Sequence, residues 1–289
     1  MTPSFLAPAW CDLKWSEFMP FRAWTGRTHP TGGGLYRIRV AGENRLAYVG
    51  QTGRNLRDRL SALRTGVLAA EMPFNDPHTA APRLWAYRDA DGLEFEASAA
   101  EVGMSKNDRM ALECYLVWQY RMEAGQSTLC NFGRTHTRYT ASRNRSTGDR
   151  GRRLNADEPD GGGWPSVPAL SHNETEDRCR WMGLTWSALA PLTGASLKGV
   201  RTKPGVYTLA TAAGDLIYIG QSTNLGLRLR SHSKFPWGLE VWWAACEFDS
   251  SYTSTQLLEI ENDLIGDFYR RYSESPPQQF GLRGTSPVD

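Results

Sequence analysis

The chain contains two copies of one pattern, and this repetition constrains its fold more than any other feature. The stretch LAYVGQTGRNLRDRLSAL at 46–63 and the stretch LIYIGQSTNLGLRLRSH at 216–232 share one order of residue types. Each places a tyrosine before a glycine turn and an arginine on the segment that follows. Such internal similarity indicates two structural units of the same kind rather than one large domain.

Further matching blocks occur in the same order in both halves. LKWSEFMP at 13–20 corresponds to LTWSALAP at 184–191, a displacement of 171 residues. GLEFEASAAE at 92–101 corresponds to GLEVWWAACE at 238–247, a displacement of 146 residues. Arg59 corresponds to Arg228 at a displacement of 169 residues, so the fall from 169 to 146 places an insertion of about 23 residues in the first half, around 66–91.

The chain is long enough for two ordinary domains, since it has 289 residues of which 40% are hydrophobic. We expect a first domain over 1–133, a connection over 134–179 and a second domain over 180–289. The connection begins with RTHTRYTASRNRSTGDRGRR, which carries seven arginines and no Leu, Ile, Val or Met. Two interpretations stay open: a solvated linker, or a basic arm that lies along a phosphate backbone.

Composition predicts a cytoplasmic protein without a membrane partner. No run of about 18 apolar residues occurs, and the first residues do not resemble a signal peptide. The five cysteines form no CxxC motif, so reduced thiols are expected. The net charge of +2 does not point to nucleic acid, but most of the basic residues are arginine, whose planar guanidinium suits phosphate. A GC-rich coding bias would explain the same excess.

The residue pattern of each copy predicts an α+β module, with a small mixed or antiparallel sheet and flanking helices. GLYRIRV alternates so that Tyr36, Ile38 and Val40 share one face, and a polar turn leads to a second strand. Asn55 and Asn224 stand where helix N-caps belong. A third strand and a long helix follow in both copies.

The long helices carry a glutamate on an apolar face. Glu261 has leucine and isoleucine neighbours at helical spacing, and Glu113 lies in similar surroundings. Glu259 has polar neighbours and is therefore expected on the exposed face. A carboxylate on an apolar face needs a partner. A salt bridge within the domain is one possibility, and recurrence in both copies favours a metal ligand.

These residues resemble the GIY-YIG nuclease family, whose pattern is Gly-x-Tyr, Tyr-x-Gly, an arginine, and a glutamate on a later helix. The resemblance covers most of both copies. It does not cover the matching blocks at 13–20 and 184–191, the insertion or the connection. The matching residues are Tyr207, Tyr218, Arg228, His232 and Glu261 in the second copy, and Tyr36, Tyr48, Arg59, Glu113 and Asn131 in the first.

The resemblance implies hydrolysis of DNA phosphodiester bonds. In the second copy, Tyr207 would help to deprotonate a water in relay with Tyr218, Arg228 would hold the phosphate and His232 would join the proton network. Glu261 and Glu113 would each hold Mg²⁺, for which Mn²⁺ can substitute. The arginines expected to contact double-stranded DNA are Arg57, Arg230, Arg143, Arg145, Arg152 and Arg153.

Each copy departs from the pattern at one position. The first has Leu63 where the histidine would stand, and the second has Gln279 where the asparagine would stand. We therefore keep several functions open. The first is an endonuclease that cuts both strands as a monomer, in restriction, repair or mobile-element cleavage. The second is a protein with one active copy beside a degenerate copy that binds DNA. The others are a DNA-binding protein without catalysis and an enzyme that acts on a small molecule.

Overall fold

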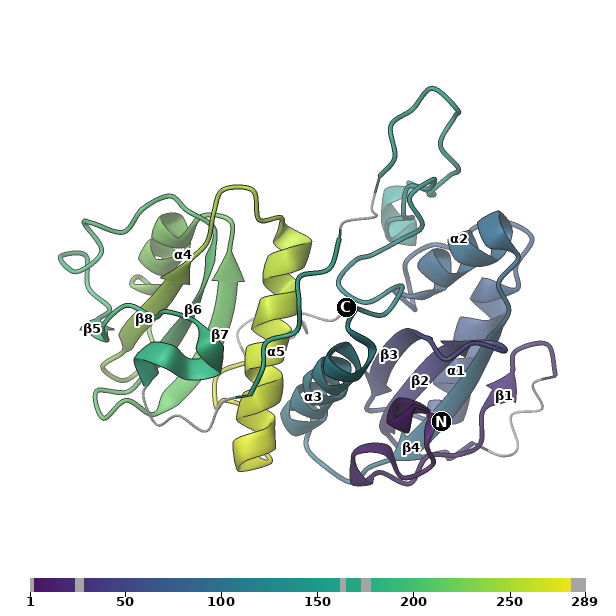
Figure 1. The fold of residues 1–289 in the computed structure, drawn as a ribbon, viewed down its shortest axis with the longest axis horizontal. Helices are drawn as coiled ribbons and strands as arrows, with labels where there is room; N and C mark the ends of the chain where they lie inside the picture. Colours follow the sequence, from purple (N-terminus) through teal and green to yellow (C-terminus); the bar gives the residue numbers. More distant parts are fainter. Residues whose placement is uncertain (1–2, 24–28, 162–164, 173–177, 282–289) are drawn as a thin grey trace.

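The computed structural model describes residues 3–23, 29–161, 165–172 and 178–281. Figure 1 shows two α+β units, each with its own sheet, and the long helices α3 (Lys106–Ala124) and α5 (Ser254–Tyr272) lie between the two sheets. The predicted α+β class is confirmed. Among the described residues, no helix is both long enough and apolar enough to span a membrane.

The first unit is a four-stranded sheet in the order β1-β4-β2-β3, with every pair antiparallel. Of the two expected sheet types, the antiparallel one is therefore correct. The strands are β1 (Met19–Pro20), β2 (Gly34–Val40), β3 (Leu46–Thr52) and β4 (Phe95–Glu101). The remaining elements are η1 (Ser4–Leu6), η2 (Trp10–Asp12), α1 (Leu56–Val67) and α2 (Ala81–Asp91), the last of which lies in the insertion.

The second unit repeats this topology as β5-β8-β6-β7, again antiparallel throughout. Its strands are β5 (Ala190–Pro191), β6 (Gly205–Ala210), β7 (Leu216–Ser222) and β8 (Trp242–Glu247). The short helix η4 (Arg178–Gly183) precedes the sheet, and α4 (Leu225–His232) follows β7. The remaining short helix, η3 (Arg145–Thr147), lies in the connection.

Local backbone geometry repeats between the units. Cys11 and Met182 both adopt positive φ angles, 53° and 56°. Gly125 and Ser273, which end the two long helices, also share the left-handed region. Such angles are uncommon for residues other than glycine, so their recurrence at matching positions shows that the two halves follow the same path in detail.

The predicted helix caps are confirmed. The Asn55 side chain accepts a hydrogen bond from the Asp58 backbone N–H, and the Asn224 side chain accepts one from Leu227. Each cap satisfies one of the N–H groups that the first helical turn leaves without a partner. The helix that carries the site arginine therefore begins at the same point in both units.

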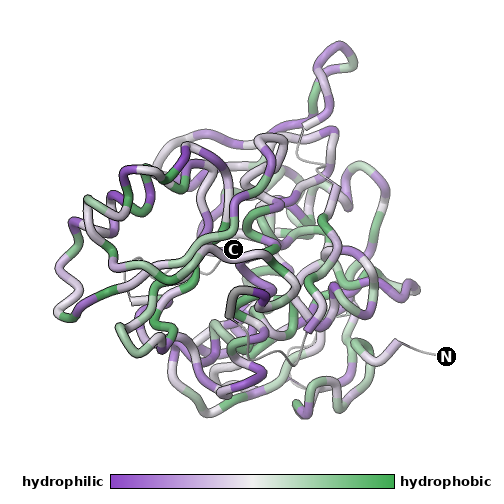
Figure 2. The backbone as a smooth tube through the Cα atoms, turned by 60° about the vertical axis from the view of Figure 1, so that its left-hand side comes forward, coloured by the Kyte–Doolittle hydropathy of each residue, from purple (hydrophilic) through white to green (hydrophobic). Residues whose placement is uncertain are grey.

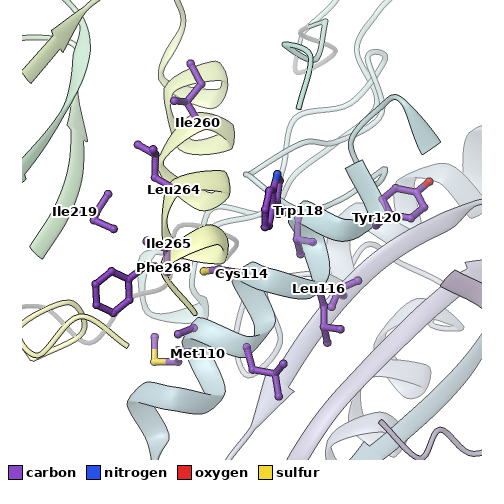
Figure 3. Packing of buried hydrophobic residues seen from close by; sticks show 14 of the residues in the cluster. Met110, Cys114, Leu116, Trp118, Tyr120, Ile219, Ile260, Leu264, Ile265 and Phe268 are labelled. Carbon is purple, nitrogen blue, oxygen red and sulfur yellow. The ribbon is translucent and has the colours of Figure 1, made fainter. Parts of the chain in front are cut away.

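Helices α3 and α5 join the units through equivalent positions. Trp118 lies between the two helices (Figure 3), and a Cβ atom on Gly266 would stand only 3.1 Å from the Trp118 Cβ. The Asn262 side chain donates to the Cys114 carbonyl at 3.2 Å. Because Trp118 corresponds to Gly266 and Cys114 to Asn262, an approximate two-fold axis passes through this contact.

The prediction that Glu259 lies on an exposed face is wrong. Its side chain is fully buried, and it accepts hydrogen bonds from Arg134 at 3.0 Å and from Ser127 at 2.7 Å. It also pairs with Arg121 at 3.1 Å. The helical period correctly assigned one face of α5 to its own sheet, but the opposite, polar face is covered by α3 and by the connection.

Parts of the connection pack on the first unit, although most of its residues between 143 and 160 are exposed. Its first part packs on the insertion, where Tyr139 is 2% exposed, stands edge-on to Trp85 and donates to Asp89 at 2.6 Å. A loop of the connection projects at the top of Figure 1, and Figure 2 shows that this loop is mostly hydrophilic. The sequence did not indicate this packing, because Tyr139 is the one aromatic residue between 134 and 153 and has no Leu, Ile, Val or Met beside it.

The later part of the connection lies along α5 and binds an acidic stripe on this helix, formed by Glu259 and Asp263. The Val167 N–H donates to Glu259 at 2.9 Å, and the Leu170 N–H donates to Asp263 at 2.9 Å. Arg121 pairs with Asp263 at 3.0 Å, with both side chains at most 1% exposed. The acidic stripe therefore accepts hydrogen bonds from backbone N–H groups of the connection that would otherwise have no partner.

Candidate active sites

The second unit places two tyrosines side by side on adjacent strands. Tyr207 on β6 and Tyr218 on β7 have ring centroids 6.0 Å apart and nearly parallel rings. Tyr207 is directly opposite Gly220 in the sheet register. A Cβ atom at Gly220 would lie 2.4 Å from the Tyr207 hydroxyl oxygen, so the Tyr-x-Gly motif needs glycine to leave room for the first tyrosine.

Helix α4 brings a histidine and an arginine to the Tyr207 hydroxyl. The Tyr207 Oη atom is 2.8 Å from His232 Nε2 and accepts a hydrogen bond from Arg228 Nε at 3.0 Å. The direction of the contact with His232 depends on which ring nitrogen of the imidazole carries the proton. Trp237 holds this arrangement by donating to the His232 carbonyl at 2.9 Å.

Burial controls the proton affinities in this cluster. It raises the pKa of Tyr207 well above the ordinary value and also raises the pKa of Tyr218, while the Arg228 charge opposes both changes. Both phenols therefore hold their protons near neutral pH. A proton acceptor within hydrogen-bond reach is required for Tyr207 to act as a base, and His232 provides one.

Glu261 joins the cluster from α5, as expected from its helical position. Burial raises the pKa of its carboxyl group to about 8, although the Arg228 charge and a hydrogen bond from the Gln221 backbone act in the opposite direction. The side chain is 8% exposed. The site thus combines a buried acid, a guanidinium, two phenols and an imidazole, all contributed by the residues that the sequence predicted.

The first unit assembles the corresponding residues. The rings of Tyr36 on β2 and Tyr48 on β3 lie 6.1 Å apart at 32°, and both are buried. Arg59 comes from α1, and Glu113, which is 1% exposed, comes from α3. A Cβ atom at Gly50 would again collide with the first tyrosine, at 2.4 Å from its hydroxyl oxygen.

A histidine from the insertion completes the first cluster. His78 Nε2 is 3.1 Å from the Tyr36 hydroxyl oxygen, which matches the pairing of His232 with Tyr207. Burial, reinforced by the Arg59 charge, lowers the pKa of His78 well below its ordinary value, so the ring is neutral. The sequence missed this residue because it lies outside the helix where the pattern expects it. His78 is the one histidine in the insertion, and this could have marked it in the sequence as a candidate site residue.

Arg59 contacts the segment that carries this histidine. Its Nη1 atom donates to the Pro77 carbonyl at 2.5 Å, one residue before His78. In the second unit, Arg228 instead donates to the tyrosine hydroxyl. The insertion therefore supplies the imidazole and also binds the arginine of its own site.

The two sites differ beside the glutamate. Arg109 lies one helical turn before Glu113, and the Glu113 charge raises its pKa against the larger, lowering effect of burial. Arg109 also donates to the Gln51 side chain at 2.9 Å. The corresponding residue of the second unit is Leu257, which is fully buried. Glu113 thus has a guanidinium neighbour on its own helix where Glu261 has a leucine.

Asn131 has the same backbone contact as Gln279. The Asn131 side chain accepts from the Val49 N–H at 3.0 Å and donates to the Val49 carbonyl at 2.9 Å. Gln279 makes the same two hydrogen bonds with Ile219, each at 2.8 Å. Both amides hold the strand that carries the second tyrosine, so the exchange of asparagine for glutamine leaves neither site incomplete.

The arginines expected at DNA differ in their contacts. Arg57 donates to the His29 carbonyl at 3.1 Å, and Arg230 is exposed on α4. The four from the connection are exposed: Arg143, Arg145, Arg152 and Arg153. Two of these pair with acidic side chains, Arg152 with Glu158 at 2.6 Å and Arg143 with Asp149 at 3.4 Å.

Each cluster offers one carboxylate to a metal. Within the described residues, no group of three or more His, Cys, Asp or Glu side chains could hold an ion. Mg²⁺ retains several waters and commonly takes only one or two carboxylate ligands. The buried Glu261 carboxyl group, with its raised pKa, fits such an ion, because a bound cation would offset the cost of ionising it there.

Comparison with known proteins gave no match. No family model matches the chain, and no curated protein or solved structure matches it.

Proposed function

We propose that the chain is a Mg²⁺-dependent DNA endonuclease of the GIY-YIG type with two sites. One observation carries the proposal: two tyrosines, an arginine, a histidine and a buried glutamate form a cluster in the second unit, and the first unit brings two tyrosines, an arginine and a histidine together, with a buried glutamate at the equivalent position of its long helix. In the first unit the histidine comes from a different segment yet contacts the same hydroxyl. A packing role for the histidine would not require it to be supplied again from an insertion.

The contacts support a division of work within the second site. His232 would take the proton of Tyr207, so that the phenolate oxygen takes a proton from the attacking water. Arg228 lies at this oxygen with a charge that would stabilise the phosphoryl group as negative charge develops. A Mg²⁺ ion held by Glu261 would polarise the phosphate and stabilise the leaving oxygen.

The two-fold relation of the units supports cleavage of both strands of a duplex by one chain. The strands of B-DNA run in opposite directions, and proteins with two-fold symmetry match that symmetry. The contact of Trp118 with Gly266 relates the two sites in this manner. We therefore propose that a monomer is sufficient for double-strand cleavage. The free thiols of Cys11, Cys114, Cys130 and Cys246 support a cytoplasmic setting.

The second site is proposed as the faster one. The histidine no longer distinguishes the sites, because His78 replaces it in the first unit. The remaining difference is Arg109, whose charge competes with a cation for Glu113. The same observation favours the second candidate function, in which the first unit only binds DNA and the chain nicks one strand.

A supercoiled plasmid incubated with the protein and Mg²⁺ tests the proposal. The wild type should yield linear product, Glu261→Gln combined with Glu113→Gln should yield none while still binding DNA, and Glu240→Gln, an exposed carboxylate, should behave as the wild type. Arg228→Ala and Arg59→Ala should each accumulate nicked circles if both sites cut. Uncut plasmid with Arg228→Ala and intact nicking with Arg59→Ala would support the nickase instead. No cleavage by the wild type would refute both.

A further inference from the structure

In the first unit, a buried guanidinium fills the space on the sheet face opposite the tyrosine cluster. Arg37 is 1% exposed, and its guanidinium carbon lies 4.3 Å from the ring centroid of Trp15. The Nη1 atom donates to the Phe5 carbonyl at 2.6 Å, and the Nη2 atom donates to the Ala7 carbonyl at 3.0 Å. This cation is thus stacked on an indole and hydrogen-bonded at its edge.

The second unit keeps the indoles, but its residue at the position of Arg37 is not basic. Trp15 donates to the Trp10 carbonyl at 3.0 Å, and Trp186 donates in the same way to the Trp181 carbonyl at 3.1 Å. The two second-unit indoles stack with centroids 5.9 Å apart. The residue that corresponds to Arg37 by sheet register is Thr208, whose side chain is much shorter.

A cavity of about 540 Å³ lies at the corresponding place in the second unit. This volume is within the range of roughly 300–1,000 Å³ that small-molecule sites occupy. Thr208 is adjacent to Tyr207 on β6, so the two side chains point to opposite faces of the sheet. The cavity is therefore separate from the proposed active site. Its main walls are Trp181, Trp186, Leu189, Thr208, Phe268 and Tyr272.

The charges that line the cavity favour a cation. Asp215 and Glu274 are both exposed lining residues, and neither forms an ion pair among the residues that the structure describes. Arg271 also lines the cavity, but its Nε atom is paired at 2.7 Å with Asp267, which is fully buried. Two carboxylates thus remain to attract a positively charged ligand.

We propose that this cavity binds a small molecule that carries a guanidinium group, stacked on Trp186 as Arg37 is stacked on Trp15. The first unit supplies the internal precedent, since the same indole pair there holds a guanidinium of the chain itself. A guanidinium is planar and weakly hydrated, so it stacks on an indole at lower desolvation cost than an ammonium. The chain would then bind this ligand at one unit only.

Calorimetric titration with L-argininamide tests this assignment, with L-lysinamide and cytidine as matched probes. We expect one argininamide per chain, with lysinamide and cytidine at least ~10-fold weaker, which corresponds to about 1.4 kcal/mol. Thr208→Arg should abolish binding, because the new side chain would occupy the cavity as Arg37 does. The double variant Asp215→Asn with Glu274→Gln should weaken argininamide binding several-fold. Both positions are exposed, so these replacements should leave the fold intact.

Three results would overturn the assignment. They are the absence of argininamide binding to the wild type at millimolar concentration, equal or tighter binding of lysinamide or cytidine, and unchanged argininamide binding by Thr208→Arg. Should Thr208→Arg fail to fold, unchanged binding by the double carboxylate variant is equally decisive. None of these titrations depends on nuclease activity.

Discussion

Tyr36 and His78 are separated by 42 residues in the sequence, yet the tyrosine hydroxyl oxygen and the histidine Nε2 atom lie 3.1 Å apart. The corresponding pair in the second unit, Tyr207 and His232, is separated by 25 residues and lies at 2.8 Å. One contact is therefore built from two different segments. The insertion that distinguishes the first unit is part of its site.

The first prediction concerns this histidine. In an Arg228→Ala background, where nicking reports on the first site, His78→Ala should slow nicking by about 10²–10⁴-fold, the usual contribution of a general acid or base. The measurement is the initial rate of nicked-circle formation. His136→Ala is the control, since His136 pairs with Asp91 and is outside the cluster. An unchanged rate for His78→Ala would show that the imidazole only packs.

The second prediction concerns Arg109. Arg109→Leu gives the first site the residue that the second site has at Leu257, and it removes a cation beside Glu113. We expect nicking by the first site to rise by roughly 10-fold at limiting Mg²⁺, since about 1.4 kcal/mol of relieved repulsion is enough. The initial nicking rate across a Mg²⁺ series, again with Arg228→Ala, provides the measurement. A lower rate at every Mg²⁺ concentration would assign Arg109 to substrate binding instead.

The third prediction concerns the pH dependence of stability. The folded pKa of Glu261 is about 8, above the unfolded value of 4.5, so the folded state binds the additional proton between these values. Stability from this group is complete below pH 4.5 and is lost as the pH rises to about 8, by roughly 1.4 kcal/mol per pH unit. Glu261→Gln removes the titration.

Urea unfolding in the presence of EDTA at pH 6, 7, 8 and 9 checks this expectation. The advantage of Glu261→Gln over the wild type should grow from pH 6 to pH 8 and then remain constant. Parallel stability curves for the two proteins would mean that the carboxyl group is not protonated in the folded state.

The fourth prediction concerns the buried network between the units. Asp263→Ala should destabilise the protein by about 3–5 kcal/mol, because it leaves the Arg121 guanidinium buried without this partner and removes the acceptor of the Leu170 N–H. Urea unfolding gives the value. Asp157→Ala, at an exposed position, should have little effect. Equal effects of the two substitutions would contradict the proposed role of the acidic stripe.

The fifth prediction concerns the arginines of the connection. Replacing Arg143, Arg145 and Arg153 by glutamine should lower the slope of log Kd against log salt by about 0.9 for each phosphate contact that is lost. Fluorescence anisotropy with a labelled duplex gives the slope. Arg152→Gln should change it less, because Arg152 makes two hydrogen bonds with Glu158, whereas the ion pair of Arg143 with Asp149 is longer, at 3.4 Å. A slope unaffected by the triple replacement would exclude the connection from the DNA interface.

The strand pattern predicted much of the fold and of each cluster. Alternation placed Tyr36, Ile38 and Val40 on one sheet face, and helical spacing placed Glu113 and Glu261 on the buried faces of their helices. These assignments succeeded because each depends on the period of one element. The antiparallel pairing followed from the short turn between the first two strands.

The remaining features depend on contacts between elements distant in sequence. Glu259 was misplaced because a helical period assumes one buried face, whereas α5 is covered on two sides. His78 has no periodic neighbours that could mark it. The contact of Asn131 with strand β3 depends on a turn 82 residues later in the chain, and no local pattern specifies it.

The covalent joining of the two units has an evolutionary consequence. In a homodimer every substitution occurs in both subunits, so a change that suits one site is imposed on the other. Here Arg109 occupies one site and Leu257 the other, and Arg37 fills a space that Thr208 leaves open. Because the halves are covalently joined, the α3–α5 contact forms at any protein concentration. Each half is therefore free to acquire its own chemistry without loss of the paired arrangement.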